Sequence, residues 1–130
     1  MISILTTHYN RPDALIFCLK AIEDVKLDLD YEIVVSDDGS TKQNIDIINR
    51  LKIDTLVLAS KNEGLASNLN KGIKACKGKY ILYVQEDFLM MPEFKTVIDE
   101  GIELLESHTL DMIRYRSNYH FKNLQPCTEH

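Results

Sequence analysis

The chain of 130 residues is 45% hydrophobic and 27% charged, which is typical of a globular protein with a substantial core. Its 15 basic and 20 acidic residues give a formal charge of −5, which argues against nucleic acid as the main partner. No apolar run reaches the roughly 18 residues that a membrane span needs, so we expect no transmembrane segment.

The three cysteines, Cys18, Cys76 and Cys127, are scattered and form no CxxC pair. Such a set favours neither a zinc site nor a disulfide framework, and it is typical of a reducing compartment. The N-terminus shows no signal-peptide pattern. These features predict a cytoplasmic protein, with the inner membrane surface as the alternative place of action.

Short apolar strands alternate with amphipathic helices in the first half of the chain. Residues 2–6 are predicted as a strand, followed by the polar stretch Thr7-His8-Tyr9-Asn10-Arg11 and a helix that begins at Pro12. Residues 31–36 are predicted as a second strand, which ends in Asp37-Asp38-Gly39-Ser40. Ser40 or Thr41 can cap the helix that comes next.

The alternation continues in the second half. Residues 54–60 are predicted as a strand, and a helix after Gly64 is expected to stop before Gly78. The stretch YILYVQEDF, residues 80–88, begins with a continuous apolar run, which predicts a strand buried on both faces. Pro92 starts a fourth helix, residues 110–115 are predicted as a fifth strand, and residues 117–130 are a tail or loop.

This order predicts an α/β domain over residues 1–116, with a doubly wound, mostly parallel sheet and helices on both faces. Ligands of such sheets bind outside the carboxyl ends of the strands. The loops after the first, second and fourth strands are expected to share that edge, which gathers Thr7, Tyr9, Asn10, Asp37, Asp38, Glu86 and Asp87.

The carboxylates at this edge suit a hard divalent cation, and the cation would suit a phosphate. Without a cation, two acidic pairs around one crevice repel each other. The structural alternatives stay open, because Asp37 could cap a helix and Glu86 with Asp87 could form a solvated turn. Of the four histidines, only His8 falls on this edge.

Several other nucleotide and phosphate chemistries are disfavoured. No G-x-G-x-x-G or P-loop motif is present. Asn62-x-Gly64 and Asn70-x-Gly72 flank a predicted helix, where Gly72 suits either close packing or a ligand. A dehalogenase-type phosphatase needs D-x-D-G at the end of a strand, whereas the acids after the second strand here are adjacent. A nucleotidyltransferase would need glycines in the first loop, and this loop has none.

Taken together, four stretches resemble family 2 glycosyltransferases of the GT-A fold, which transfer a sugar from a nucleotide-diphosphate donor. The matching stretches are SILTTHYNRPDAL, YEIVVSDDGST, NEGLASNLNKGIKACKGKYI and YVQEDFLMMP, and they occur in the family's order over residues 2–116. The joint spacing is more specific than any single motif.

The resemblance implies a nucleotide-sugar donor, UDP-linked, and an acceptor that is a saccharide, lipid or protein. It implies that Thr7 and Tyr9 border the base, that Asp38 pairs with the uracil and that Asp37 lies beside the nucleoside. Asp87 would ligate Mn²⁺ or Mg²⁺ that bridges the diphosphate, with Glu86 near the ribose or metal. The family transfers with inversion, and no residue is assigned here as the general base.

Family members run to roughly twice this length. The resemblance therefore implies that the chain holds the donor half of such an enzyme. The alternative is a truncated or degenerate donor-binding module that lacks the acceptor half and transfers nothing.

Overall fold

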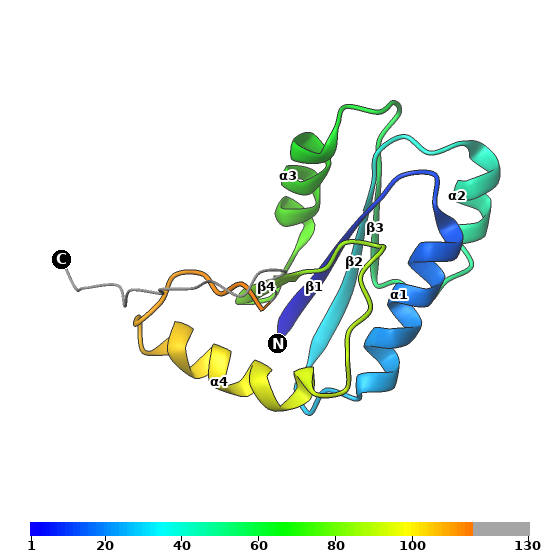
Figure 1. Ribbon diagram of the computed structural model, residues 1–130. Coiled ribbons are helices and arrows are strands. Elements are labelled where there is room, and N and C mark those ends of the chain that lie inside the picture. The colour runs from blue at the N-terminus through cyan, green and yellow to red at the C-terminus, as the bar shows by residue number, and fades with distance from the viewer. Residues whose placement is uncertain (116–130) are drawn as a thin grey trace, which may run out of the picture. The chain divides into compact units, whose positions relative to one another are not determined.

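The computed structural model describes residues 1–115, in which strands and helices alternate along the chain (Figure 1). The chain forms two compact units, Met1–Lys95 and a second unit that begins at Thr96. The predicted tail, residues 117–130, lies outside the described residues. The elements are β1 (Ile2–His8), α1 (Pro12–Val25), β2 (Tyr31–Asp37), α2 (Lys42–Ile48), β3 (Thr55–Leu58), α3 (Leu65–Ala75), β4 (Tyr80–Tyr83) and α4 (Phe94–Glu106).

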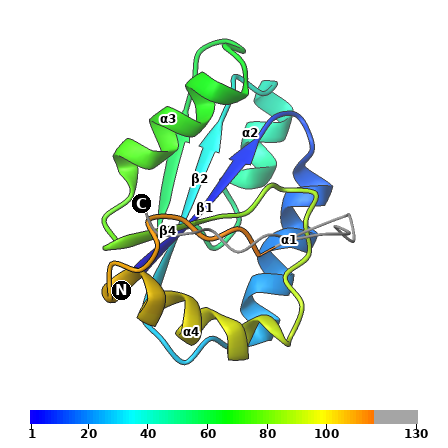
Figure 2. The same cartoon turned by 60° about the vertical axis from the view of Figure 1, so that its left-hand side comes forward.

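The four strands of the first unit form one parallel sheet in the order β3-β2-β1-β4. Helix α3 covers one face of this sheet, and α1 and α2 cover the other (Figures 1 and 2). The prediction of a doubly wound α/β fold with helices on both faces is therefore confirmed. None of the helices within residues 1–115 is both long and apolar enough to cross a membrane.

The core lies around the two central strands. All seven residues of β1 are buried, because helices cover both faces of the sheet and Ile2–Leu5 also have a paired strand on each side. Apolar side chains of β1 and β2 point alternately to the two faces, as strand geometry requires. Fully buried apolar side chains on these strands and the covering helices are Ile4, Leu5, Leu15, Cys18, Val34, Val35 and Ile48.

The prediction that the strand beginning at Tyr80 is buried on both faces is wrong. β4 is an edge strand of the four-stranded sheet, it ends at Tyr83, and Ile81 is 41% exposed. A continuous apolar run looks the same for a central strand and for an edge strand, since the number of neighbouring strands is not encoded in the run itself. The central positions belong to β1 and β2.

The prediction of a fifth strand over residues 110–115 is also wrong. These residues form no strand, and Met112 is 82% exposed. Within the second unit the chain turns back along α4 instead, so that Ile113 and Tyr115 lie against Gly101 of that helix. Burial there raises the pKa of Tyr115.

Pairing between β1 and β4 stops partway along β1. The two strands pair from Ile2 to Leu5, and the backbone N–H of Val84 donates to the carbonyl of Leu5 at 2.9 Å. Beyond this point β1 is paired with β2 alone, as far as His8 opposite Asp37. The last three residues of β1, Thr6 to His8, are therefore not paired with β4.

Gly72 brings α3 close to the sheet. A Cβ atom at this position would overlap Leu5 Cδ1 and lie 3.1 Å from Ser36 Cβ. Of the two roles left open for this glycine, close helix packing is the one that the structure supports.

We expect Gly72→Ala to lower the free energy of unfolding by about 1–3 kcal/mol, because the added methyl group overpacks a close helix–sheet contact. Urea denaturation measures this change. Asn70→Ala, at an exposed position of the same helix, is the control and should change stability by less than about 0.5 kcal/mol. Equal effects of the two substitutions would contradict the close packing.

Candidate functional site

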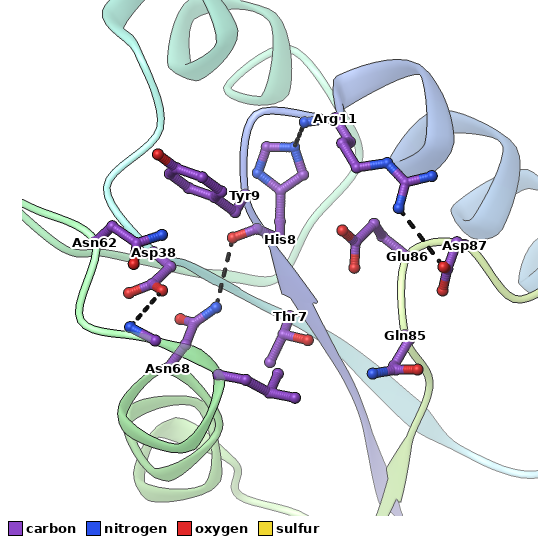
Figure 3. Close-up of a pocket in the computed structure, with 12 residues that line it drawn as sticks. Thr7, His8, Tyr9, Arg11, Asp38, Asn62, Asn68, Gln85, Glu86 and Asp87 are labelled. Carbon is purple, nitrogen blue, oxygen red and sulfur yellow. Dashed lines mark hydrogen bonds and ion pairs between the residues drawn. The ribbon is translucent and has the colours of Figure 1, made fainter.

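A crevice of about 310 Å³ opens at the carboxyl edge of the sheet, in the first unit (Figure 3). It lies where the strand order reverses between β1 and β4, which is the usual ligand site of doubly wound sheets. The residues that line it are Thr7, His8, Tyr9, Arg11, Asp38, Asn62, Gly64, Leu65, Asn68, Gln85, Glu86 and Asp87. Five of the six predicted site residues are thus brought together, and Asp37 lies behind them.

Asp37 is fully buried at the end of β2, where it joins the end of β1 to the turn that follows β2. One carboxylate oxygen accepts from His8 Nδ1 at 2.8 Å and from the Ser40 hydroxyl. The other accepts from the backbone N–H groups of Gly39 at 3.0 Å and Ser40 at 2.8 Å. Burial alone would raise the pKa of Asp37, but hydrogen bonds from His8 and Ser40 outweigh burial and hold that pKa below its ordinary value.

His8 links this carboxylate to the first loop. Its Nε2 accepts from the backbone N–H of Arg11 at 3.2 Å, and a backbone N–H can only donate. The Nδ1 atom therefore carries the hydrogen that faces Asp37. His8 lines the crevice, but it is only 1% exposed and both ring nitrogens are engaged, so its ring positions the loop.

Asp38 follows β2 directly and faces the crevice (Figure 3). Its oxygens accept from the backbone N–H groups of Glu63 and Gly64, each at 2.9 Å. Each carboxylate oxygen has a second acceptor position, so Asp38 can still accept from a ligand N–H. This carboxylate both holds the loop before α3 and presents acceptor capacity to the crevice.

Asn10 fixes the loop that carries Tyr9 and Arg11. It adopts a left-handed backbone conformation with φ of 51°, which asparagine tolerates better than most residues. Its side-chain oxygen accepts from the backbone N–H of Thr41 at 2.8 Å and from Asn44 Nδ2 at 2.9 Å. The loop is therefore fastened to the start of α2.

Thr7 and Tyr9 form the floor and one side of the crevice. Thr7 is 3% exposed, and its hydroxyl is 2.8 Å from the hydroxyl of Tyr83 on β4. Tyr9 is 43% exposed and lies on the same side as Asp38 and Asn62 (Figure 3). An exposed aromatic ring beside buried polar groups is a surface on which a flat ligand can stack.

The opposite wall carries the acids that follow β4. Asp87 forms an ion pair with Arg11 at 3.5 Å, with Asp87 and Arg11 side chains 49% and 55% exposed. Within residues 1–115, no group of three or more His, Cys, Asp or Glu side chains is placed to hold a metal ion. Two carboxylates are nevertheless a donor set that suits Mg²⁺ or Mn²⁺ when phosphate oxygens supply further ligands.

Cys18 of α1 anchors the backbone that leads to these acids. Its thiol donates to the carbonyl of Gln85 at 3.7 Å. Burial raises the pKa of Cys18 to about 11, so the sulfur keeps its proton and remains a donor. Both described cysteines, Cys18 and Cys76, are free.

Asn68 is a site residue that the sequence reasoning missed. It is 2% exposed on α3, and its Nδ2 donates to the carbonyl of Ser36 at 2.9 Å and to that of His8 at 3.4 Å. Asn68 lies four residues before Gly72, on the helix face that packs against the sheet. A polar residue on a packed face is the signal that could have identified it.

Comparisons with known proteins agree with this geometry. The family model "Glycosyl transferase family 2" matches residues 3–129. The chain is 33% identical to the UDP-Glc:alpha-D-GlcNAc-diphosphoundecaprenol beta-1,3-glucosyltransferase WfaP of Escherichia coli over 93 residues, which cover 67% of this chain and 35% of WfaP.

Two solved structures share the fold. TarS 1-349 of S. aureus superposes with a TM-score of 0.67 at 22% identity, covering 95% of this chain and 38% of that chain. The mannosyltransferase PcManGT of Pyrobaculum calidifontis, solved with GDP-Man and Mn²⁺, gives a TM-score of 0.66 at 21% identity, covering 80% and 32%.

The chain thus spans well under half the length of the proteins that it matches. The family model covers most of the chain, and the sheet order and the position of the crevice agree with the resemblance seen in the sequence. The chain belongs to glycosyl transferase family 2 and has the GT-A fold.

Proposed function

We propose that the chain binds a nucleotide-diphosphate sugar, UDP-linked, in the crevice together with Mn²⁺ or Mg²⁺. The observation that carries the proposal is the separation of the crevice into two walls with different chemistry. Tyr9 and Asp38 offer a stacking surface and a hydrogen-bond acceptor on one side, whereas Glu86 and Asp87 offer metal ligands on the other. A nucleoside suits the first wall and a metal-bound diphosphate suits the second.

The first wall would hold the nucleoside. Thr7 and Tyr9 would border the base, and Asp38 would accept the N–H of the uracil ring. Asp37 is buried behind this wall, so its contribution to nucleotide binding would be to hold His8 and the turn at Gly39 in place. The UDP donor named for WfaP supports a uracil base.

The second wall would hold the metal and the diphosphate. Asp87 would ligate the cation, and Glu86 would approach the ribose or the cation. A bound divalent cation supplies electrostatic stabilisation of a diphosphate leaving group. The structure of PcManGT with GDP-Man and Mn²⁺ supports a divalent metal as part of donor binding.

With a donor held in this way, the family resemblance supports inverting transfer to an acceptor hydroxyl of a saccharide, lipid or protein. No described crevice residue is assigned as the general base, since Asp38, Glu86 and Asp87 are the acids that line it and each has a part in donor binding. This observation favours a second candidate, a donor-binding module that performs no transfer.

Thermal melting with UDP or GDP, with and without Mn²⁺, tests the proposal. A ligand at 100 times its Kd should stabilise the parent by about 2.7 kcal/mol. We expect the shift with UDP to be larger when Mn²⁺ is present, because the cation offsets the charge of the crevice. Asp87→Asn should lose the effect of Mn²⁺ and keep the metal-free shift.

Asp46→Asn, at an exposed position of α2, removes the same charge away from the crevice and should behave as the parent does. The absence of a metal-dependent shift in the parent with either nucleotide would refute the proposal. Binding with no hydrolysis or transfer of the sugar would favour the donor-binding module.

A further inference from the structure

The guanidinium of Arg11 is the cationic side chain of the crevice in the described part of the chain. Three carboxylates line the crevice with it, those of Asp38, Glu86 and Asp87. A diphosphate that entered would meet this acidic surface, so a positive side chain on the path of the phosphates would add to the effect of the proposed cation. Arg11 lies on the second wall, beside Asp87 (Figure 3).

The main chain of Arg11 is held firmly, while its side chain is half exposed. Its backbone N–H donates to His8 Nε2 at 3.2 Å, and its carbonyl accepts from Leu15 in the first turn of α1 at 3.2 Å. The preceding residue, Asn10, is fastened to the start of α2. The guanidinium is therefore an exposed cationic group on a fixed backbone.

The present partner of this guanidinium is Asp87, which is also the proposed metal ligand. Arg11 Nη1 and Asp87 Oδ2 are 3.5 Å apart, and both side chains are about half exposed. Exposed ion pairs of this kind contribute little, so either partner exchanges readily for a stronger one. A divalent cation is a stronger partner for the carboxylate, and a diphosphate is a stronger partner for the planar guanidinium.

We propose that Arg11 exchanges partners when the donor binds. Before binding, the guanidinium covers the Asp87 carboxylate and competes with the divalent cation. On binding, Asp87 passes to the cation and Arg11 passes to the oxygens of the diphosphate. This inference rests on the proposed donor site and assigns a positioning and phosphate-binding role to a residue of the first loop.

The proposed exchange predicts that one substitution, Arg11→Gln, strengthens the binding of one ligand and weakens the binding of another. In Arg11→Gln, binding of Mn²⁺ alone should become about two- to fivefold tighter, because the competing ion pair is lost. Binding of UDP with Mn²⁺ should become at least roughly tenfold weaker, because a charge-assisted hydrogen bond to the diphosphate is lost. A residue that only supports the fold would not strengthen any binding.

Titration calorimetry of the 130-residue chain with Mn²⁺, uridine and UDP measures these effects. Uridine has no phosphate, so its affinity should be unchanged in Arg11→Gln. Arg50→Gln is the matched control, because Arg50 follows α2, is exposed and does not line the crevice. Arg11→Lys should bind UDP with intermediate affinity, since it keeps the charge and loses the planar fork.

The outcomes separate this inference from the proposed function. If the parent binds UDP with Mn²⁺ and Arg11→Gln binds both ligands as the parent does, the exchange is refuted and the donor site stands. An equal loss of affinity for uridine and for UDP in Arg11→Gln would also refute the exchange. Arg11 would then support the conformation of the whole site and would have no specific role at the diphosphate. If the parent binds no nucleotide, both proposals are overturned.

Discussion

Replacing Asp37 with alanine is expected to lower the free energy of unfolding by about 3 kcal/mol, because several buried donors lose their acceptor together. The substitution leaves His8 Nδ1, the backbone N–H groups of Gly39 and Ser40, and the Ser40 hydroxyl without this carboxylate. Urea denaturation at pH 7 measures the loss. Asp46→Ala, on the exposed side of α2, should change stability by less than about 0.5 kcal/mol.

The same carboxylate makes stability depend on acid. The pKa of Asp37 in the folded chain lies below its ordinary value, so the unfolded chain binds the proton first as the pH falls. The contribution of Asp37 is therefore full well above about pH 4 and is lost as the pH falls through the lowered folded-state pKa. The difference in stability between the parent and Asp37→Ala should shrink below about pH 4, and a constant difference down to pH 2 would contradict the assignment.

Replacing Asp38 with asparagine is expected to weaken UDP binding at least tenfold, a loss of about 1.4 kcal/mol or more. Asparagine puts an NH₂ group where one carboxylate oxygen now accepts the backbone N–H of Glu63 or Gly64. Two donors then face each other, and the loop before α3 is released from the crevice. The variant also loses an acceptor for the base, so uridine and UDP should weaken alike.

Calorimetry with uridine, UDP and Mn²⁺ distinguishes the loss of nucleoside binding in Asp38→Asn from a loss of metal binding at Glu86 and Asp87. Mn²⁺ alone should bind Asp38→Asn as it binds the parent, since the metal ligands follow β4. Ser67→Ala is the control, because it removes a hydrogen bond to Glu63 at 3.0 Å and does not touch Asp38. Unchanged uridine affinity in Asp38→Asn would show that this carboxylate does not face the base.

Local sequence rules predicted the alternation of strands and helices well. Pro12 begins α1 and Thr41 caps α2 by accepting from the backbone N–H of Asn44, as their residue types indicate. The adjacent acids after β2 were also placed at the correct edge. Their different environments follow from strand alternation, which turns Asp37 into the core and Asp38 toward the crevice.

Features that depend on contacts between residues far apart in the chain could not be predicted from local sequence rules. The apolar run of β4 does not reveal that β4 is an edge strand of the sheet formed by residues 1–115. The position of Arg11 beside Asp87 joins two loops that are 76 residues apart in the chain (87 − 11). Asn68 was missed because an asparagine within a helix is usually exposed, and only the close approach of α3 at Gly72 turns it inward.

β1 pairs with β4 over only part of its length. This partial pairing separates the backbone contacts that hold the sheet together from the residues that contact the ligand. Four rungs, Ile2 to Leu5, tie β1 to β4, and the crevice begins where those rungs end. Within residues 1–115, the three residues beyond them leave roughly 10 Å of β1 without a paired strand on that side. The residues after Val84 thus lie outside the paired part of the sheet, and Gln85, Glu86 and Asp87 line the crevice there. The length of the β1–β4 pairing therefore determines where the chain that carries these crevice residues leaves the sheet.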